Sequence, residues 1–171
     1  MAKGMEHLAA SRGARASDEI KNRRMKITQA LLAEHVVFHN LFDHIEQAVP
    51  KLESLPEVRA LAALLESMLK VHSLVEDKLL VEPLEPSLSQ IGQDQNFHDE
   101  HKEIDADLTR VQATRNLKEG RRRLLRAVAL SRRHFDKEER IVFPLAEKVL
   151  SPKTLLDLGK RWEAHRNDFV A

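Results

Sequence analysis

The chain carries one helical pattern twice, and this internal repeat restricts its fold more than any other feature of the sequence. The segments VHSLVEDKLLVEP at 71–83 and RHFDKEERIVFP at 133–144 share a histidine, an acidic residue four positions later, a second acidic residue, an apolar stretch and a proline. The segments AEHVVFHNLF at 33–42 and DEHKEIDADL at 99–108 share an acid–histidine pair and an apolar residue three positions further on. Self-similarity of this kind indicates copies of one structural unit. We therefore predict two helical hairpins of one design, related by a pseudo-two-fold axis.

Apolar residues recur along most of the chain at intervals close to the period of an α-helix. Helices are predicted over 17–49, 54–82, 96–114, 119–150 and 152–168. Pro83 and Pro86 are expected to end the second helix before a loop over 84–95, and Pro144 is expected to kink the fourth. The apolar stripes predicted to face the core include Ile27, Leu31, Val37, Leu64, Leu74 and Ile141. These elements predict an all-α, antiparallel up-down four-helix bundle with a short fifth helix at the C-terminal end.

The composition fits a single domain and excludes several kinds of chemistry. A chain of 171 residues suits one domain, with 1–16 predicted as a disordered lead and 17–171 as the folded part. Cysteine and tyrosine are absent, which excludes disulfides, Cys-ligated zinc, iron–sulfur clusters and tyrosyl radicals. The formal net charge is +1, so bulk charge predicts neither a nucleic-acid nor a membrane partner. We expect a cytoplasmic location, because the sequence shows neither a membrane-spanning apolar run nor the apolar core of a secretory signal.

Histidines and carboxylates occupy matching positions in the two halves of the chain. His72 precedes Glu76 by four residues and His134 precedes Glu138 by four, so each pair lies on one face of a helix. The first helix of each hairpin adds one more histidine. The six predicted metal ligands are His35, His72, Glu76, His101, His134 and Glu138.

These six groups favour a metal site because of the cost of burying them alone. Polar groups in a bundle core without partners cost on the order of several kcal/mol. Two metal ions would satisfy all six, with two histidines on each ion and both carboxylates bridging. Imidazole and carboxylate together suit iron, manganese or zinc better than calcium or magnesium. A single His–Glu pair at this spacing is more often a surface pair that contributes about 0.2–0.5 kcal/mol, and it is the duplication that favours the metal site.

The order of these residues resembles the hemerythrin-like (HHE) family, in the variant pattern H…HxxxE…H…HxxxE. The resemblance covers residues 20–165 and includes the stretch HFDKEERIVFPLAEKVL at 134–150. It implies a four-helix bundle that holds a non-haem di-iron centre with an oxo or hydroxo bridge, with iron preferred over manganese or zinc. It also implies an open position where O2, peroxide or nitric oxide binds.

Two positions differ from the oxygen-carrying hemerythrins, which resemble this chain but have a second histidine in the third helix and an aspartate at the last position. Here the residue four positions after His101 is Asp105, and the last carboxylate is Glu138. We therefore expect redox chemistry, nitric oxide chemistry or sensing rather than simple reversible oxygen carriage.

Other polar residues near the predicted ligands have more than one interpretation. His39 and Asp105 each follow a predicted ligand by four residues, so either could be an additional ligand or a neighbour of the site. His98 precedes His101 by three residues and is expected around the site or at the surface. Four acidic residues beside the ligands either form solvated helix faces or orient the ligands: Glu34, Asp77, Glu100 and Glu139.

Charge is segregated along the chain although the net charge is small. Residues 115–133, the basic stripe, carry eight Lys/Arg and one acidic residue, whereas 76–107 carry ten acidic residues and two basic ones. The basic stripe has no aromatic interleaving, so we expect a solvated helix face or a docking site for a protein partner, without nucleic-acid binding. Either a monomer or a dimer is compatible with the sequence.

Four functions remain open at the level of sequence. The first is a di-iron protein that binds or reacts with O2, peroxide or nitric oxide, with or without catalase- or peroxidase-like turnover. The second is a sensor in which the metal or its oxidation changes the packing of the bundle. The third is an oxygenase acting on a small organic substrate, which requires an apolar pocket beside the metals. The fourth is a purely structural bundle, so whether the chain is an enzyme stays open.

Overall fold

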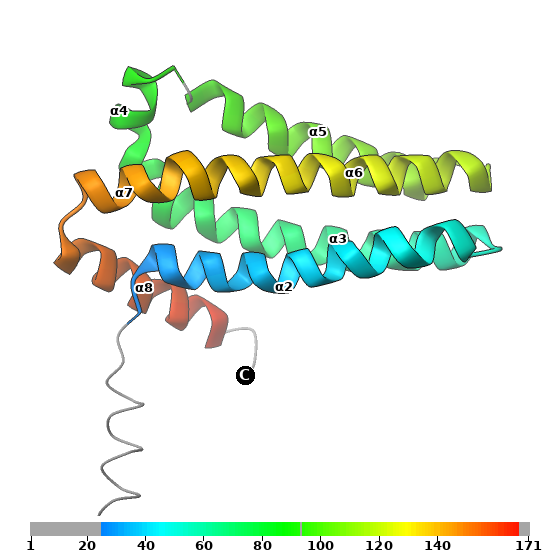
Figure 1. The fold of residues 1–171 in the computed structure, drawn as a ribbon, viewed down its shortest axis with the longest axis horizontal. Coiled ribbons are helices and arrows are strands. Elements are labelled where there is room, and N and C mark those ends of the chain that lie inside the picture. The colour runs from blue at the N-terminus through cyan, green and yellow to red at the C-terminus, as the bar shows by residue number, and fades with distance from the viewer. Residues whose placement is uncertain (1–24, 93, 168–171) are drawn as a thin grey trace, which may run out of the picture.

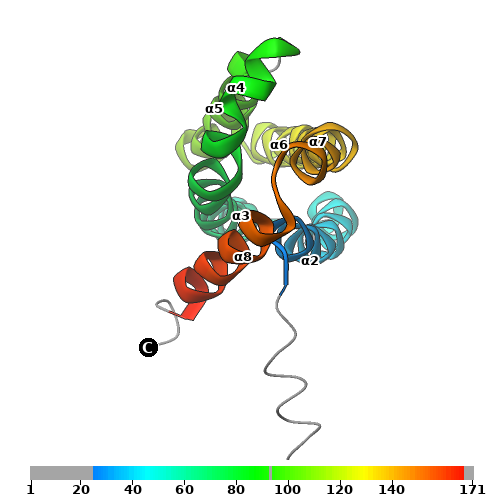
Figure 2. The same ribbon diagram turned by 90° about the vertical axis from the view of Figure 1, so that its left-hand side faces the viewer.

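The computed structural model describes residues 25–92 and 94–167, and every element in these residues is a helix (Figure 1). The four long helices are α2 (Ile27–Ala48), α3 (Leu55–Glu76), α5 (Asp94–Ala113) and α6 (Leu117–Lys137). Figures 1 and 2 show these four side by side, with their axes roughly along a common direction. The all-α prediction is confirmed. Among the described helices, none combines the length and the apolar character that are needed to cross a membrane.

Local sequence signals set the beginnings of α3 and α6. Before α3, the amide and the hydroxyl of Ser54 both donate to Glu57 Oε2, at 3.0 and 2.6 Å, and this pair forms a capping box. Before α6, the side-chain oxygen of Asn116 accepts from the amide of Glu119 at 3.0 Å. The contacts donated by the Ser54 and Glu119 amides satisfy backbone donors that the start of a helix leaves without partners.

The helix predicted over 17–49 begins later than expected. The amide of Lys26 donates to the side chain of Gln29 at 3.1 Å, and Lys26 itself is extended, so α2 begins at Ile27. The predicted start at Ser17 and the predicted lead over 1–16 lie outside the described residues. At its other end α2 gives way to the 3-10 turn η1 (Val49–Lys51), which contains Pro50.

One π-helical turn follows α3, and another follows α6. The turn η2 (Asp77–Val81) leads from α3 into α4 (Glu82–Gln90), and η3 (Glu138–Val142) leads from α6 into α7 (Phe143–Val149). The prediction that Pro83 and Pro86 end the helix is therefore wrong, as is most of the predicted loop over 84–95. Pro83 and Pro144 both stand at the start of the α-helix that follows a π turn, a position where proline is tolerated.

The apolar core consists of two clusters, and the polar site lies between them along the helices. One cluster includes Phe38, Phe42, Leu65, Leu69, Ile104, Leu124, Val128 and Phe135. The other includes Ile27, Leu31, Val75, Leu79, Leu80, Val142, Phe143, Leu155 and Leu158. Four residues predicted for the core are exposed instead: Val37, Leu64, Leu74 and Ile141. Val37 and Leu74 each follow a buried histidine by two residues, which turns them about 200° away from it around the helix.

The fifth predicted helix is present as α8 (Pro152–Asn167). It contacts α2 and lies across the end of the long helices where α2 begins (Figure 2). Leu155 and Leu158 are buried in the second apolar cluster, so α8 packs on the core through its first half.

Candidate metal centre

The structure brings the six predicted ligands together from four helices and one π turn. They are His35 on α2, His72 and Glu76 on α3, His101 on α5, His134 on α6 and Glu138 at the first position of η3. Five of them are buried, whereas 18% of the His101 side chain remains exposed. Both glutamates lie next to a π turn, a helix irregularity that often occurs at functional sites.

The six side chains form two overlapping groups. The first group is His35, His72, Glu76 and Glu138, and the second is His101, His134, Glu76 and Glu138. Within each group the candidate ligand atoms all lie within 4.8 Å of one another. The two glutamates belong to both groups, so each carboxylate is placed to contact two ions. This is the arrangement in which two ions take two histidines each and share two carboxylates.

Several buried atoms in these groups have no hydrogen-bond partner. They are Nε2 of His35, Nε2 of His72, both carboxylate oxygens of Glu76 and Oε2 of Glu138. An unsatisfied buried polar atom costs about 1–3 kcal/mol. All these atoms point into the same small space, since His35 Nε2 is 3.4 Å from Glu138 Oε2 and His72 Nε2 is 3.8 Å from Glu76 Oε2. The donor set, its burial and its lack of partners fit a pair of metal ions.

The other ring nitrogen of each histidine faces a carboxylate outside the two groups. The Nδ1 atoms of His35, His72 and His134 lie 2.9, 2.7 and 2.8 Å from carboxylate oxygens, and that of His101 lies 3.8 Å from one. The partners, in the same order, are Glu139, Glu34, Glu100 and Asp77. A carboxylate at Nδ1 holds the ring and leaves Nε2 for the metal. Of the two interpretations of these four acidic residues, the geometry favours the one in which they orient ligands.

These outer contacts repeat the symmetry of the sequence. Glu34 and Glu100 each contact the histidine on the second helix of their own hairpin. Asp77 and Glu139 each face the histidine on the first helix of the other hairpin. The outer carboxylates therefore connect the hairpins to each other as well as the helices within each hairpin.

Burial and mutual charge move the pKa values of the site in opposite directions. Burial, with the nearby Glu138 carboxylate, raises the pKa of Glu76 well above its usual value. Burial also disfavours the charged forms of Glu138 and His134, but their contact at 2.6 Å and the Glu100 carboxylate prevail. The contact with His134 lowers the pKa of Glu138 to about 2, and the Glu138 and Glu100 carboxylates raise the pKa of His134 to about 9. Burial lowers the pKa of His35 to about 4.

Aromatic rings enclose the first group of ligands. The ring of Phe135 stacks on His35 at 3.9 Å between centroids, and the ring of Phe38 meets His72 edge-on at 5.2 Å. Phe143 lies 5.3 Å from His35 on another side. These rings surround the first group with apolar surface, and a less polar environment strengthens electrostatic interactions.

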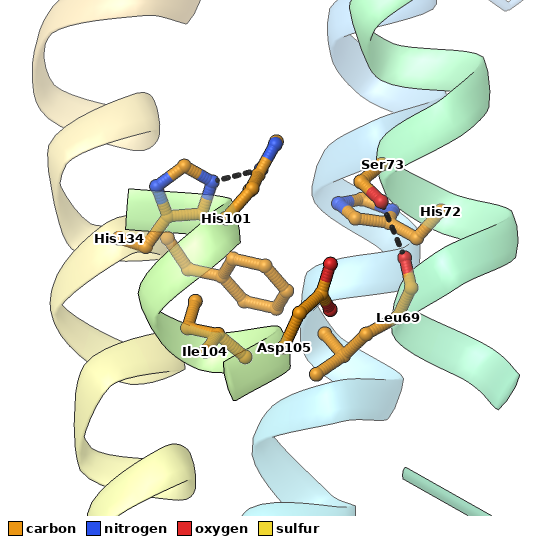
Figure 3. Close-up of a pocket in the computed structure, with 8 residues that line it drawn as sticks. Leu69, His72, Ser73, His101, Ile104, Asp105 and His134 are labelled. Carbon is orange, nitrogen blue, oxygen red and sulfur yellow. Dashed lines mark hydrogen bonds between the residues drawn. The ribbon is translucent and has the colours of Figure 1, made fainter. Parts of the chain in front are cut away.

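Two cavities border the site. A cavity of about 20 Å³ lies between α3 and α5, and its lining includes His72, His101, His134 and Asp105 (Figure 3). This volume admits about one water-sized molecule. A larger cavity of about 480 Å³ lies against α2 and α3, and its lining is largely apolar. It shares His72 with the small cavity and also contains Phe38.

Two of the additional candidates, His39 and Asp105, fall outside both groups. His39 has Nδ1 3.3 Å from Arg132 Nη1 and Nε2 3.7 Å from a Glu139 oxygen, and its side chain is 36% exposed. Asp105 lines the small cavity, and burial raises its pKa above the usual value. The side chain of His98 lies outside the described part of the structure.

Two residues that sequence reasoning missed approach the site from α8. Trp162 and Arg166 both donate to Glu34, whose other oxygen contacts His72. Trp162 and Arg166 lie 128 and 132 positions after Glu34 in the sequence, and α8 carries no ligand pattern that could have indicated the contact.

The basic stripe is engaged in contacts within the chain. Arg123 contacts the buried Asp107 at 2.8 Å, and Arg126 contacts the same carboxylate. Arg122 contacts Glu119 at 2.6 Å. Part of the positive charge over 115–133 is thus paired with acidic residues of α5 and α6, and the choice between a solvated helix face and a docking site stays a prediction.

The fold and the site together define a helical protein with a candidate metal centre of histidines and carboxylates. The family model described as hemerythrin, "Hemerythrin HHE cation binding domain", matches residues 26–146, which is more than half of the chain. The chain belongs to this family. No curated protein and no solved structure gives a significant match to it. The matched residues include all six candidate ligands, whereas α8 lies beyond them.

Proposed function

We propose that the protein holds two iron ions and binds or reacts with O2, peroxide or nitric oxide. His35 and His72 would hold one ion, His101 and His134 the other, and Glu76 and Glu138 would contact both. The observation that carries this proposal is the pair of overlapping groups whose buried donor atoms have no hydrogen-bond partner. For the scaffold we propose the antiparallel up-down connection of two hairpins that the repeat predicts. Four imidazoles favour iron over manganese, which prefers oxygen ligands.

Iron held by these residues would supply reversible one-electron oxidation. The chain's own residues supply the rest. The outer carboxylates face Nδ1 of His35, His72 and His134, and with a metal bound they would hold the hydrogen on Nδ1 and leave Nε2 for the ion. Phe38, Phe135 and Phe143 keep the centre dry. The cavity of about 20 Å³ beside His101 and His134 admits a small molecule of the size of O2 or nitric oxide and excludes larger ones.

A second candidate is an oxygenase that acts on a small organic substrate. The observation in its favour is the cavity of about 480 Å³, because apolar pockets of this size commonly bind small organic molecules. Val37, Met68 and Val71 line it, and His72 forms the part nearest the metal groups. A sensor role for the same centre predicts little turnover and a change of shape with the oxidation state.

The test is the metal content of the purified protein together with its visible spectrum before and after dithionite, air, peroxide and nitric oxide. Two irons per chain and bands that respond to these reagents support the proposal. The rate of peroxide loss then separates turnover from sensing. A matched control is His44→Ala, since His44 is exposed on α2 and contributes to neither group. A wild-type protein without iron, or with one zinc and a silent spectrum, would reject the redox function.

A further inference from the structure

The C-terminal helix α8 reaches the outer edge of the candidate metal centre. Trp162 Nε1 donates to Glu34 Oε1 at 3.1 Å, and Arg166 Nε donates to the same oxygen at 2.6 Å. Arg166 Nη2 lies 2.5 Å from that oxygen as well. The other oxygen of this carboxylate, Oε2, is 2.7 Å from His72 Nδ1. A single carboxylate thus connects α8 to one histidine of the centre.

We infer that Trp162 and Arg166 are positioning residues of the metal centre, and this inference rests on the proposed function. With donors on Oε1, the Glu34 side chain is held in one rotamer and presents Oε2 to the imidazole. The imidazole of His72 then keeps its hydrogen on Nδ1 and its lone pair on Nε2, directed at the first group. Without these donors, Glu34 is free to rotate toward water, and the ring loses the contact that fixes its orientation.

The position of α8 is fixed by packing that does not involve the site. A Cβ atom on Gly159 would lie 1.9 Å from the carbonyl oxygen of Met25, so only glycine allows α8 to approach the start of α2 this closely. Leu155 and Leu158 anchor the same part of the helix in the core. Trp162 and Arg166 follow Gly159 by three and seven residues, so all three lie on one face of the helix. The donors therefore approach Glu34 from a fixed direction.

The outer carboxylate beside His134 accepts from a different donor, which provides a comparison within the same molecule. Glu100, the counterpart of Glu34, accepts from Lys137 Nζ at 2.9 Å while its other oxygen contacts His134. Lys137 belongs to α6 of the same hairpin, whereas Arg166 belongs to α8. The two groups of ligands therefore depend on different outer donors. Substitutions in α8 should affect only the group that contains His72.

The test compares Fe(II) affinities in anaerobic chelator competition for wild type, Trp162→Phe, Arg166→Met and the control Arg161→Met. Arg161 is an exposed residue on the same helix. We expect Trp162→Phe and Arg166→Met each to lower the Fe(II) affinity at one of the two positions by about 10–100-fold, as loss of an outer partner typically does. We expect Arg161→Met to leave both ions unchanged. Lys137→Met should lower the affinity for one ion, and only its combination with Arg166→Met should lower the affinity for both ions.

Melting temperatures of the metal-free variants separate positioning from general destabilisation. Trp162→Phe keeps an aromatic ring in place, so it tests the donor even if Arg166→Met fails to fold. The inference is overturned if both variants bind two ions as tightly as Arg161→Met does. It is also overturned if both ions weaken equally while the metal-free melting temperature falls. A wild-type chain that binds no Fe(II) would instead reject the proposed function, and with it the inference.

Discussion

Replacing Glu76 by methionine should stabilise the metal-free protein, although most substitutions of fully buried residues destabilise. Glu76 is 0% exposed, and neither of its carboxylate oxygens has a hydrogen-bond partner. An unsatisfied buried polar group costs about 1–3 kcal/mol, and methionine fills a similar space without a polar atom that needs a partner. We expect Glu76→Met to raise the free energy of unfolding of the metal-free protein by about 2 kcal/mol. For a chain of this size that corresponds to a melting temperature about 4–8 °C higher.

Chemical denaturation with and without metal measures this effect. With Fe(II) present, wild type should be more stable than Glu76→Met, because Glu76 belongs to both ligand groups and its loss would remove a contact from each ion. Glu66→Met, the same substitution on the same helix at a partly exposed position, should change stability by less than about 0.5 kcal/mol. Two results would refute the reasoning. One is a metal-free Glu76→Met protein less stable than wild type, and the other is a variant that still binds two ions tightly.

Three further predictions concern other parts of the same structure. His72→Ala should lower both the iron content and the iron-dependent gain in melting temperature, because metal binding contributes to folding free energy; full iron retention by elemental analysis would contradict the ligand assignment. The raised pKa of Glu76 means that the metal-free folded state binds this proton more tightly than the unfolded state does, so its contribution to stability is present below pH 4.5 and is lost as the pH rises. The gain in free energy of unfolding from Glu76→Met, measured by urea denaturation, should therefore be larger at pH 8 than at pH 5. An equal gain at both pH values would contradict the raised pKa of Glu76. Gly159→Ala should cost about 1–3 kcal/mol of unfolding free energy, because its Cβ would lie 1.9 Å from the carbonyl oxygen of Met25; unchanged stability would show that α8 shifts freely.

The sequence was sufficient to predict the helical class, the family and the set of residues that meet in the interior. The i,i+4 spacing of His72 and Glu76, repeated in the second half, depends only on helix geometry. The structure places these side chains and their counterparts in two groups, as the spacing predicts. That the groups bind metal, and which metal, stays a prediction.

Other features depend on contacts that a local pattern does not contain. Pro83 does not end the helix because the π turn η2 comes directly before α4. The chain has therefore already departed from α-helical hydrogen bonding before it reaches Pro83. The apolar pattern of the sequence predicts Val37 in the core, but the buried face of α2 contains His35 and Phe38, and Val37 is exposed. The contact of Trp162 with Glu34 joins residues 128 positions apart, and only the packing of α8 on the start of α2 brings them together.

The division of ligands between the hairpins explains why the chain needs both halves. Each hairpin supplies two histidines and one glutamate, so each group takes three ligands from its own hairpin and the fourth, Glu76 or Glu138, from the other. Neither hairpin contains a complete group by itself. In the absence of ions, the two buried glutamates lie close together, and the raised pKa of Glu76 reflects the cost of keeping both of them charged there. Bound ions would favour the charged form of both glutamates and connect them, while Asp77 and Glu139 would still contact the histidines of the opposite hairpin. We therefore expect metal binding to strengthen the association of the two hairpins.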